Sequence, residues 1–282
     1  MALAFLRVKC HNIINLVGIR ILGGDYMLDP MKYGKARGAE LARKYFPKKV
    51  PFGKLTILET LDDWLEVKDD YGKFVLTRID WPVGAKTTAF RTIGASGNVD
   101  DIPRLIEAAQ EHGGVVLLME PKNNCRRYNY DGGFNVLFNV DQEVIIEFVG
   151  KGFDAHEITQ GLAVHERYTI PWDDVPFIGC RDKLREYGGI VVNNSEYAAQ
   201  RKERFGYLVD GCNYSPEDVE AGLPTSLEEI NVATTLDFIA NILFEAYRKR
   251  LMLLSDGLEK FSVQGNFVNW ESQPWEIYTG KR

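Results

Sequence analysis

The sequence predicts an α+β fold with a helical C-terminal segment. Five short runs between Leu55 and Val149 are rich in β-branched and aromatic residues, which is typical of strands. A helix with clear start and stop signals is predicted over residues 100–112, between two of these runs. Beyond Pro224 the apolar residues recur at helical spacing. Strands and helices that follow one another in this irregular order indicate the α+β class.

Three segments are expected, because Pro- or Gly-rich joints occur at residues 46–51 and 221–225. Residues 1–52 form an N-terminal covering segment with a basic helix over residues 34–45. Residues 53–210 form the mixed α+β region, and residues 211–282 are mainly helical.

The predicted strands of the middle region are Leu55–Leu58, Phe74–Arg78, Val115–Met119, Phe134–Val140 and Glu143–Val149. The helix over 100–112 starts after Asn98, carries Pro103 in its first turn and ends at Gly113. Val140-Asp-Gln-Glu143 lies between two apolar runs, so we expect a hairpin turn there.

The C-terminal region opens with the capping box Ser226-Leu-Glu-Glu229, and apolar residues at helical spacing continue to about Leu254. Residues 260–265 are expected to return as a strand. Trp270 and Trp275 are expected to anchor the tail against the body.

Composition limits the function classes. With 282 residues, 45% of them hydrophobic, the chain can bury a large core without metal or disulfides. Its net charge of -6 argues against a protein that mainly neutralises nucleic-acid phosphates. Four cysteines occur without a Cys-x-x-Cys pair. Charged residues interrupt the apolar stretch at residues 1–22, so we expect this stretch to be neither a signal peptide nor a membrane span. We expect a soluble, cytoplasmic protein without a membrane partner.

Cations and glycines follow the strand that ends at Arg78. Lys86, Arg91 and Gly94-Ala-Ser-Gly97 lie between it and the helix at 100–112. Cations offset phosphate charge and a helix start offers free amides, so this segment suits an anionic ligand. The alternative is a pair of glycine turns with solvated cations. Neither a Walker A motif nor a dinucleotide fingerprint is present.

Carboxylates in or after apolar strands are the second candidate feature. Glu120 closes the strand at residues 115–119, and Glu147 lies inside an apolar strand, where an unpaired buried charge would be costly. Magnesium ligation together with Asp154 or Glu157 would explain Glu147. The alternative is that strand alternation turns Glu147 outward beside Glu143.

A zinc hydrolase and a cysteine nucleophile are poorly supported. His156 and His165 are nine residues apart, so they lie on opposite sides of a helix or strand. Cys125 lies beside Arg126 and Arg127, which would lower its pKa, but no partnering base is evident.

In their order, several of these segments resemble the nucleotide-binding part of the ATP-grasp superfamily, especially the N-terminal domain of phosphoenolpyruvate synthase and pyruvate phosphate dikinase. The segments are Phe74–Arg78, Leu117–Glu120, Gly133–Val140, Glu143–Gly150, Gly152–Gly161 and His165–Tyr168. Phe153 and Asp154 depart from the family pattern, and Val263-Gln264-Gly265 is at most a remnant of its Leu-Gln-x-Arg-Pro end. No swivelling domain with a phosphorylated histidine follows, so the dikinase reaction is not expected.

The resemblance implies an ATP-grasp-like fold of two lobes with mixed or antiparallel sheets, binding ATP and Mg²⁺ between them. It implies that Arg78 and Glu157 are catalytic, that Arg78, Lys86 and Glu120 bind the nucleotide, and that Glu147 and Glu157 hold the metal. The reaction would be phosphoryl transfer or ligation, as in a transferase or ligase, with a small-molecule acceptor of unknown identity.

Two other functions stay open. A non-catalytic interaction or assembly protein with a degenerate nucleotide-binding fold, including a homo-oligomer, would suit the aromatic content of 12% and the tryptophan-bearing tail. A nucleic-acid binder could use the basic run at residues 43–54, but the acidic total disfavours it.

Overall fold

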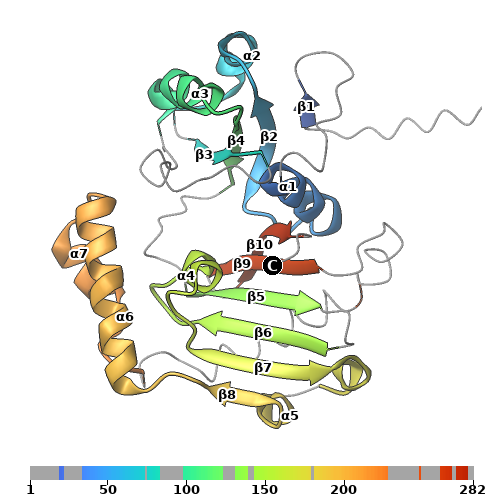
Figure 1. Cartoon of the computed structure of the whole chain (residues 1–282), viewed down its shortest axis with the longest axis vertical. Coiled ribbons are helices and arrows are strands. Elements are labelled where there is room, and N and C mark those ends of the chain that lie inside the picture. Colours follow the sequence, from blue (N-terminus) through green and yellow to red (C-terminus); the bar gives the residue numbers. More distant parts are fainter. Residues whose placement is uncertain are drawn as a thin grey trace, which may run out of the picture.

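The computed structural model describes residues 19–21, 34–73, 75–82, 98–122, 131–138, 143–178, 181–227, 248, 261–268 and 271–278. Two sheets form its framework (Figure 1). The small sheet has four strands in the order β1-β2-β4-β3, and the large sheet has six in the order β10-β9-β5-β6-β7-β8. The predicted α+β class with antiparallel sheets is confirmed.

The small sheet consists of β1 (Ile19–Ile21), β2 (Phe52–Leu58), β3 (Leu76–Asp80) and β4 (Val115–Pro121). β1 is parallel to β2, whereas β2 and β3 are antiparallel to β4. The outer face packs against α2 (Leu61–Val67) and α3 (Ile102–Gln110). The turn η3 (Val99–Asp101) precedes α3, and η1 (Lys68–Asp70) follows α2.

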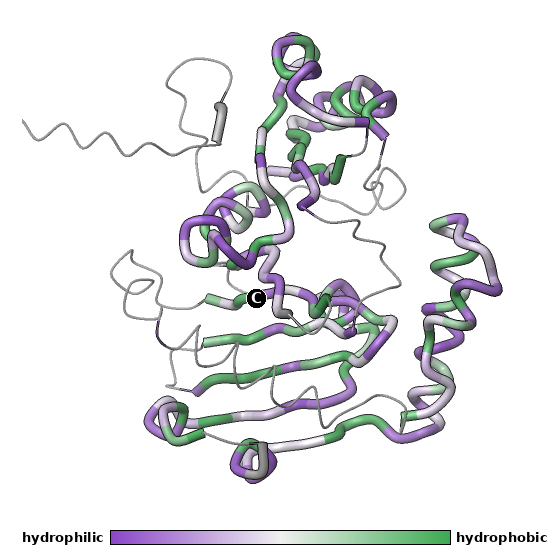
Figure 2. The backbone as a smooth tube through the Cα atoms, turned by 180° about the vertical axis from the view of Figure 1, so that it is seen from behind, coloured by the Kyte–Doolittle hydropathy of each residue, from purple (hydrophilic) through white to green (hydrophobic). Residues whose placement is uncertain are grey.

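The large sheet consists of β5 (Gly132–Phe138), β6 (Glu143–Val149), β7 (Glu166–Pro171), β8 (Gly188–Ile190), β9 (Phe261–Val268) and β10 (Glu271–Tyr278). All neighbours are antiparallel. Val263, Val136, Ile146 and Tyr168 lie opposite one another and are buried, so they mark the apolar face. β5 and β6 are accordingly mostly hydrophobic in Figure 2.

Helix α1 (Gly34–Tyr45) joins the two sheets, since it packs closely against β10 and also contacts β3. Ala36, Ala39 and Ala42 are buried in a core that includes residues of both sheets. A side chain at Gly38 would collide with Glu276, because an added Cβ would lie 2.5 Å from its Cγ. The predicted helix is confirmed, but it is a core element and not merely a cover.

The remaining helices lie along the large sheet and beside it. They are α4 (Ala155–Gln160), η4 (Trp172–Phe177), α5 (Arg181–Arg185), α6 (Asn194–Gly206), the π-helical turn η5 (Tyr207–Gly211) and α7 (Pro216–Gly222). α6 and α7 stand beside the sheet in Figure 1. A separate apolar cluster that includes Phe153, Tyr197 and Val219 holds them to α4.

Most predicted elements of the middle region are confirmed. The helix at 100–112 occurs as η3 and α3, and β5 and β6 pair as the expected hairpin. The strand expected at 260–265 is β9, and its partner β10 was not predicted. Phe74, Lys86, Trp270 and almost all of the predicted helix after Pro224 lie outside the described residues. Among the described residues, no helix is long and apolar enough to cross a membrane.

Candidate functional site

A row of polar residues crosses the face of the large sheet opposite to its apolar face. The row consists of Glu276, Gln264, Asn135, Glu147 and Arg167, from β10, β9, β5, β6 and β7 in that order. Each residue is the register partner of the next, so their side chains point to the same face. Strands lie about 4.8 Å apart, so this polar row is about 19 Å long.

Local irregularities and hydrogen bonds position the polar row. The register of β10 shifts between Pro274 and Glu276, which brings Glu276 opposite Gln264. The Nδ2 of Asn135 donates to Oε2 of Glu147 over 3.1 Å. Among the described residues, none donates a hydrogen bond to the buried Oδ1 of Asn135, and only 1% of Asn135 is exposed. A buried acceptor without a donor or cation is costly and indicates a place where a ligand could bind.

Arg78 connects the small sheet to one end of the polar row. Its Nη1 lies 2.7 Å from Oε2 of Glu276, and the side chains are 42% and 6% exposed. Arg78 belongs to β3 and faces away from the helices that cover the outer face of the small sheet, because its neighbours Thr77 and Ile79 point toward them. The ion pair therefore bridges the two sheets.

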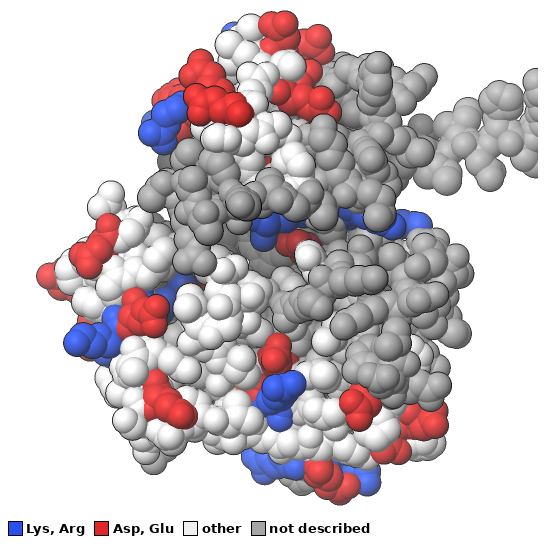
Figure 3. Space-filling model, viewed as in Figure 1, with Lys and Arg blue, Asp and Glu red and all other residues white. Residues whose placement is uncertain are grey.

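Two further charges complete a junction cluster of Lys35, Arg78, Asp80 and Glu276. The backbone N–H of Ala36 donates to Oδ2 of Asp80 over 2.7 Å, which ties the start of α1 to β3. Burial, followed by the charge of Arg78, lowers the pKa of Lys35, and burial raises the pKa of Asp80. Figure 3 shows basic and acidic groups together in a hollow between the two sheets.

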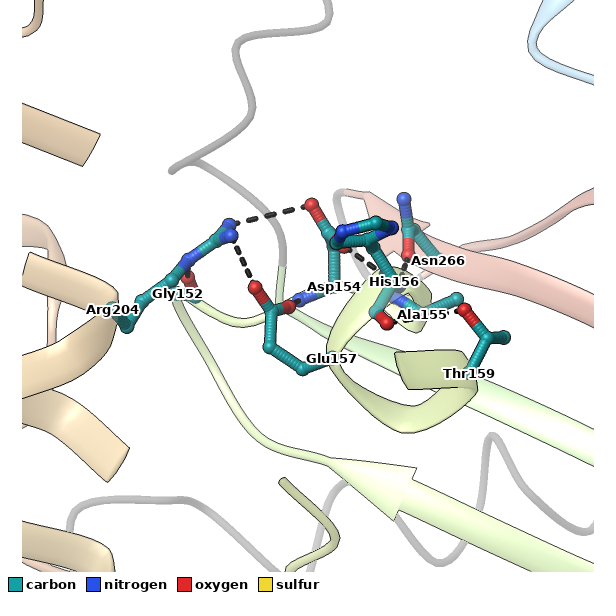
Figure 4. Close-up of polar contacts among 8 residues, drawn as sticks. All are labelled: Gly152, Asp154, Ala155, His156, Glu157, Thr159, Arg204 and Asn266. Carbon is teal, nitrogen blue, oxygen red and sulfur yellow. Dashed lines mark hydrogen bonds and ion pairs between the residues drawn. The ribbon is translucent and has the colours of Figure 1, made fainter. Parts of the chain in front are cut away.

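Glu157 belongs to a different cluster (Figure 4). Its Oε2 accepts the N–H of Asp154 over 2.8 Å in a capping box, and its Oε1 pairs with Arg204 of α6. Arg204 also contacts Asp154 at 3.3 Å and donates to the carbonyl of Gly152 over 3.1 Å. Burial, followed by the charge of Asp154, raises the pKa of Glu157 to about 7. The cluster attaches α6 to α4, and both carboxylate oxygens of Glu157 are already engaged.

The structure separates the other predicted site residues. Arg78 pairs with Glu276 at one end of the polar row, whereas Glu147 is a member of the row and accepts a hydrogen bond from Asn135. Glu147 does lie on the less buried face together with Glu143, as strand alternation predicts. Glu120 is exposed near the end of β4, with Oε2 lying over Gly53. Lys86 lies outside the described residues.

His165 has a structural environment. Its Nδ1 accepts the N–H of Gly150 over 2.9 Å, and its ring contacts Phe153 and Tyr197. Burial lowers its pKa to about 4, so the ring is neutral at physiological pH. Over the ranges that the structure describes, no group of three His, Cys, Asp or Glu side chains could hold a metal ion.

Sequence reasoning missed most of the polar row. Asn135 interrupts an apolar strand, and this interruption is the signal that could have marked it, whereas Gln264 and Glu276 lie in strands with several polar residues. Lys35 was part of a helix interpreted only as a cover. The row itself depends on the register between distant strands, which the sequence does not display.

Comparison with known proteins adds little. No family model matches the chain, and no curated protein matches it. Among solved structures, it is similar to the crystal structure of PH1788 from Pyrococcus horikoshii Ot3, with 12% identity and a TM-score of 0.39. That alignment covers 83% of this chain and 86% of the other.

Proposed function

We propose that the chain is an ATP- and magnesium-dependent enzyme of the ATP-grasp type, which binds the nucleotide between its two sheets. The observation that carries the proposal is the Arg78–Glu276 pair, in which a cation of the small sheet meets the end of a polar row on the large one. Phosphoryl transfer requires mainly positioning and charge neutralisation, and both can be provided by side chains that meet at such a junction.

The cations of the junction cluster would hold the phosphates. Arg78 and Lys35 are two positive charges close enough for the one to lower the pKa of the other. An anion bound between them would relieve that repulsion. Lys86, which follows β3 in the chain, keeps its predicted role as a further phosphate contact. Glu120 is not assigned to the nucleotide, because alternation along β4 places it on the same face as Leu118, which packs against α2 and α3, and not on the face of Arg78.

The oxygen atoms of the polar row suit Mg²⁺. This ion prefers oxygen ligands and is usually held by one or two carboxylates together with substrate phosphates. Glu276 and Gln264 are register partners on adjacent strands, and Asn135 next to them has the buried Oδ1 without a partner. We therefore assign the metal to this end of the row. Glu147 lies on the other side of Asn135 from this end, and Glu157 stays in its buried ion pair with Arg204. Neither residue is therefore assigned to the metal.

The four charges of the junction cluster balance in the absence of a ligand. When a metal complex of ATP binds, Glu276 can exchange Arg78 for the cation, and Arg78 can exchange Glu276 for a phosphate. Each charge then keeps an opposite partner, which avoids the cost of leaving the buried carboxylate of Glu276 uncompensated. In this proposal the Arg78–Glu276 pair is the resting state of the same site.

Ligand-induced stabilisation tests this proposal. We expect millimolar ATP with Mg²⁺ to raise the melting temperature, and to raise it less when the metal is removed with EDTA. Arg78→Gln and Glu276→Gln should each reduce the increment that the ligand causes, whatever their effect on the free protein. Arg104→Gln, which changes an exposed arginine of α3, serves as the matched control.

Two results would contradict the proposal. One is an unchanged melting temperature with ATP and Mg²⁺, confirmed by calorimetric titration. The other is an equal ligand-induced increment in the wild type and in both junction variants, which would place the nucleotide elsewhere.

A non-catalytic assembly protein is the second candidate function. It is favoured by Ile190 and Val191, which are 54% and 55% exposed at the edge strand β8 of the large sheet. Light scattering over a range of concentrations tests it. A monomer at all concentrations would dispose of self-assembly, and a concentration-dependent mass without nucleotide binding would favour assembly over the enzyme.

A further inference from the structure

We propose that two copies of this chain associate beside their small sheets, with helix α2 of each copy docked on a basic segment of the other. The α2 surface consists of residues 59–70, and the basic segment consists of residues 43–54 together with Lys122. This inference does not rest on the proposed function, because neither surface includes a residue of the junction cluster or the polar row. It also uses a different part of the molecule from the edge strand β8.

The α2 surface carries an apolar pair that the chain leaves uncovered. Leu61 and Leu65 are four residues apart on α2, so they lie on one side of the helix, and they are 40% and 51% exposed. Trp64 and Val67 are buried in the core beneath the same helix. The helix is therefore already held by its inner side, and its outer apolar pair is available to a partner.

Acidic side chains flank this apolar pair. Residues 59–70 contain six acidic residues and one basic residue, and Figure 3 shows acidic groups gathered over α2 and α3. Asp63 caps its own helix, whereas Asp62 and Glu66, which directly follow the two leucines, are exposed. An apolar centre with a negative rim fits a partner surface with a positive rim.

The basic segment has the opposite charge. Residues 43–54 contain five basic residues and no acidic one, although the net charge of the chain is -6. The fold adds a sixth cation, since the N–H of Lys122 donates to the carbonyl of Pro51 over 2.9 Å and its Nζ donates to the carbonyl of Pro47 over 3.3 Å. Lysine stems can cover exposed leucines while their ammonium groups reach carboxylates.

The cations of the basic segment lie close enough to repel one another. Burial, followed by the charge of Arg43, lowers the pKa of Lys122. Glu120 lies beside the segment, with Oε2 over Gly53, and six cations leave the surface positive despite it. Carboxylates of a docked partner would relieve this repulsion.

A second copy is the favoured occupant because one chain supplies both complementary surfaces. They adjoin each other, since Nζ of Lys54 lies 2.6 Å from Oδ2 of Asp70. A twofold axis that passes near this ion pair would place the α2 surface of each copy on the basic segment of the other. The same contact is then made twice in a closed dimer.

The mass of the protein at two salt concentrations is the first test. We expect light scattering to show a dimer at about 50 mM salt and a monomer at about 500 mM, because the higher concentration screens pairs between exposed charges. A wild type that stays monomeric at low salt and millimolar protein overturns the proposal. An oligonucleotide that binds this monomer but not Lys48→Glu would then assign the basic segment to nucleic acid.

Charge reversals identify the two surfaces. Glu66→Lys and Lys48→Glu should each be monomeric at low salt, because like charges then face each other across the twofold axis. An equimolar mixture of these two variants should restore the dimer, since each copy then meets the opposite charge at both contacts. Leu65→Ser should weaken the wild-type dimer by at least about fivefold, because its apolar side chain is covered in the contact.

Glu203→Lys and Lys202→Glu are the matched controls. Both residues are exposed on α6, and the two substitutions change the net charge by the same amounts as the surface variants. Each control should dimerise like the wild type, and circular dichroism should show that all variants are folded. A dimer that persists in both surface variants, or a mixture of them that stays monomeric, would show that the copies associate elsewhere and not as proposed. Stabilisation by ATP and Mg²⁺ should be the same in every variant, so the proposed function stands or fails separately.

Discussion

At the scale of single residues, the chain tolerates buried carboxylates by supplying hydrogen-bond donors and by retaining protons. Glu157 has Arg204 and a backbone N–H, whereas within the described ranges Glu166 accepts one hydrogen bond, from the hydroxyl of Tyr168 to Oε2 over 2.6 Å. The other oxygen of Glu166 is buried without a partner. Burial raises the pKa of Glu166 to about 7, although Tyr168 opposes this shift.

This shift predicts how stability depends on pH. A carboxyl whose pKa is higher in the folded state binds its proton more tightly there, so it favours folding below its unfolded pKa of 4.5. That contribution is lost as the pH rises through about 7. Glu166→Gln mimics the protonated form, so at about pH 8 it should raise the free energy of unfolding by on the order of 2 kcal/mol. At about pH 4.5 it should change little. Urea unfolding at both pH values measures the difference.

The exposed residue Glu107 of α3 provides the control, since Glu107→Gln should leave the pH profile unaltered. A profile for Glu166→Gln that runs parallel to the wild type between about pH 4.5 and 8 would mean that Glu166 is solvated or charged in the folded protein.

At the scale of elements, helix α4 is seated directly on strand β5. The backbone N–H of Ala155 donates to Oδ1 of Asn266 on β9 over 2.8 Å. An added Cβ at Gly133 would lie 2.3 Å from that same nitrogen. The contact thus requires a residue without a side chain in β5. It also fixes where Asp154 and Glu157 meet Arg204.

Gly133→Ala is therefore expected to destabilise the protein. The new methyl group meets backbone atoms that cannot move aside as a flexible side chain can, so we expect a loss of at least about 2 kcal/mol. Gly189→Ala on β8 is the matched control, because an added Cβ there meets nothing within 4 Å. Thermal unfolding of both variants checks the prediction. Equal melting temperatures would show that α4 does not rest on β5 as described.

The elements were largely predictable from sequence, whereas the site was not. Asn98, Pro103 and Gly113 are local signals, and they predict α3 because caps and turns act over a few residues. The polar row depends on pairings such as Asn135 with Gln264, between residues far apart in the chain. The position of Glu276 opposite Gln264 also depends on a register shift in β10, which no short sequence pattern predicts. Glu157 was predicted as a metal ligand from the order of the motifs, and no local pattern could reveal its pairing with Arg204, which is 47 residues away.

At the scale of the whole molecule, helix α1 and the C-terminal hairpin of β9 and β10 hold the two sheets together. Helix α1 and strand β10 pack against each other, and β9 pairs with both β10 and β5, so it connects β10 to the rest of the large sheet. One apolar core contains Leu55 and Leu117 of the small sheet together with Val263 and Phe267 of the large one. The Arg78–Glu276 pair lies at the same junction. Folding of the large sheet and assembly of the candidate site therefore depend on the same C-terminal hairpin.

Removal of that hairpin should prevent cooperative folding of the large sheet. A chain that stops after Lys260 lacks β9 and β10, which exposes the edge of β5, the apolar side chains of its core face and the buried face of α1. We expect a lower and broader urea transition, with a smaller dependence on denaturant because less surface is buried. Near-UV circular dichroism should lose the signal of packed aromatic residues such as Phe134, which contacts Phe267. A chain that stops after Tyr278 keeps both strands and is the control, so equal unfolding of the two truncated chains would show that β9 and β10 do not complete the core.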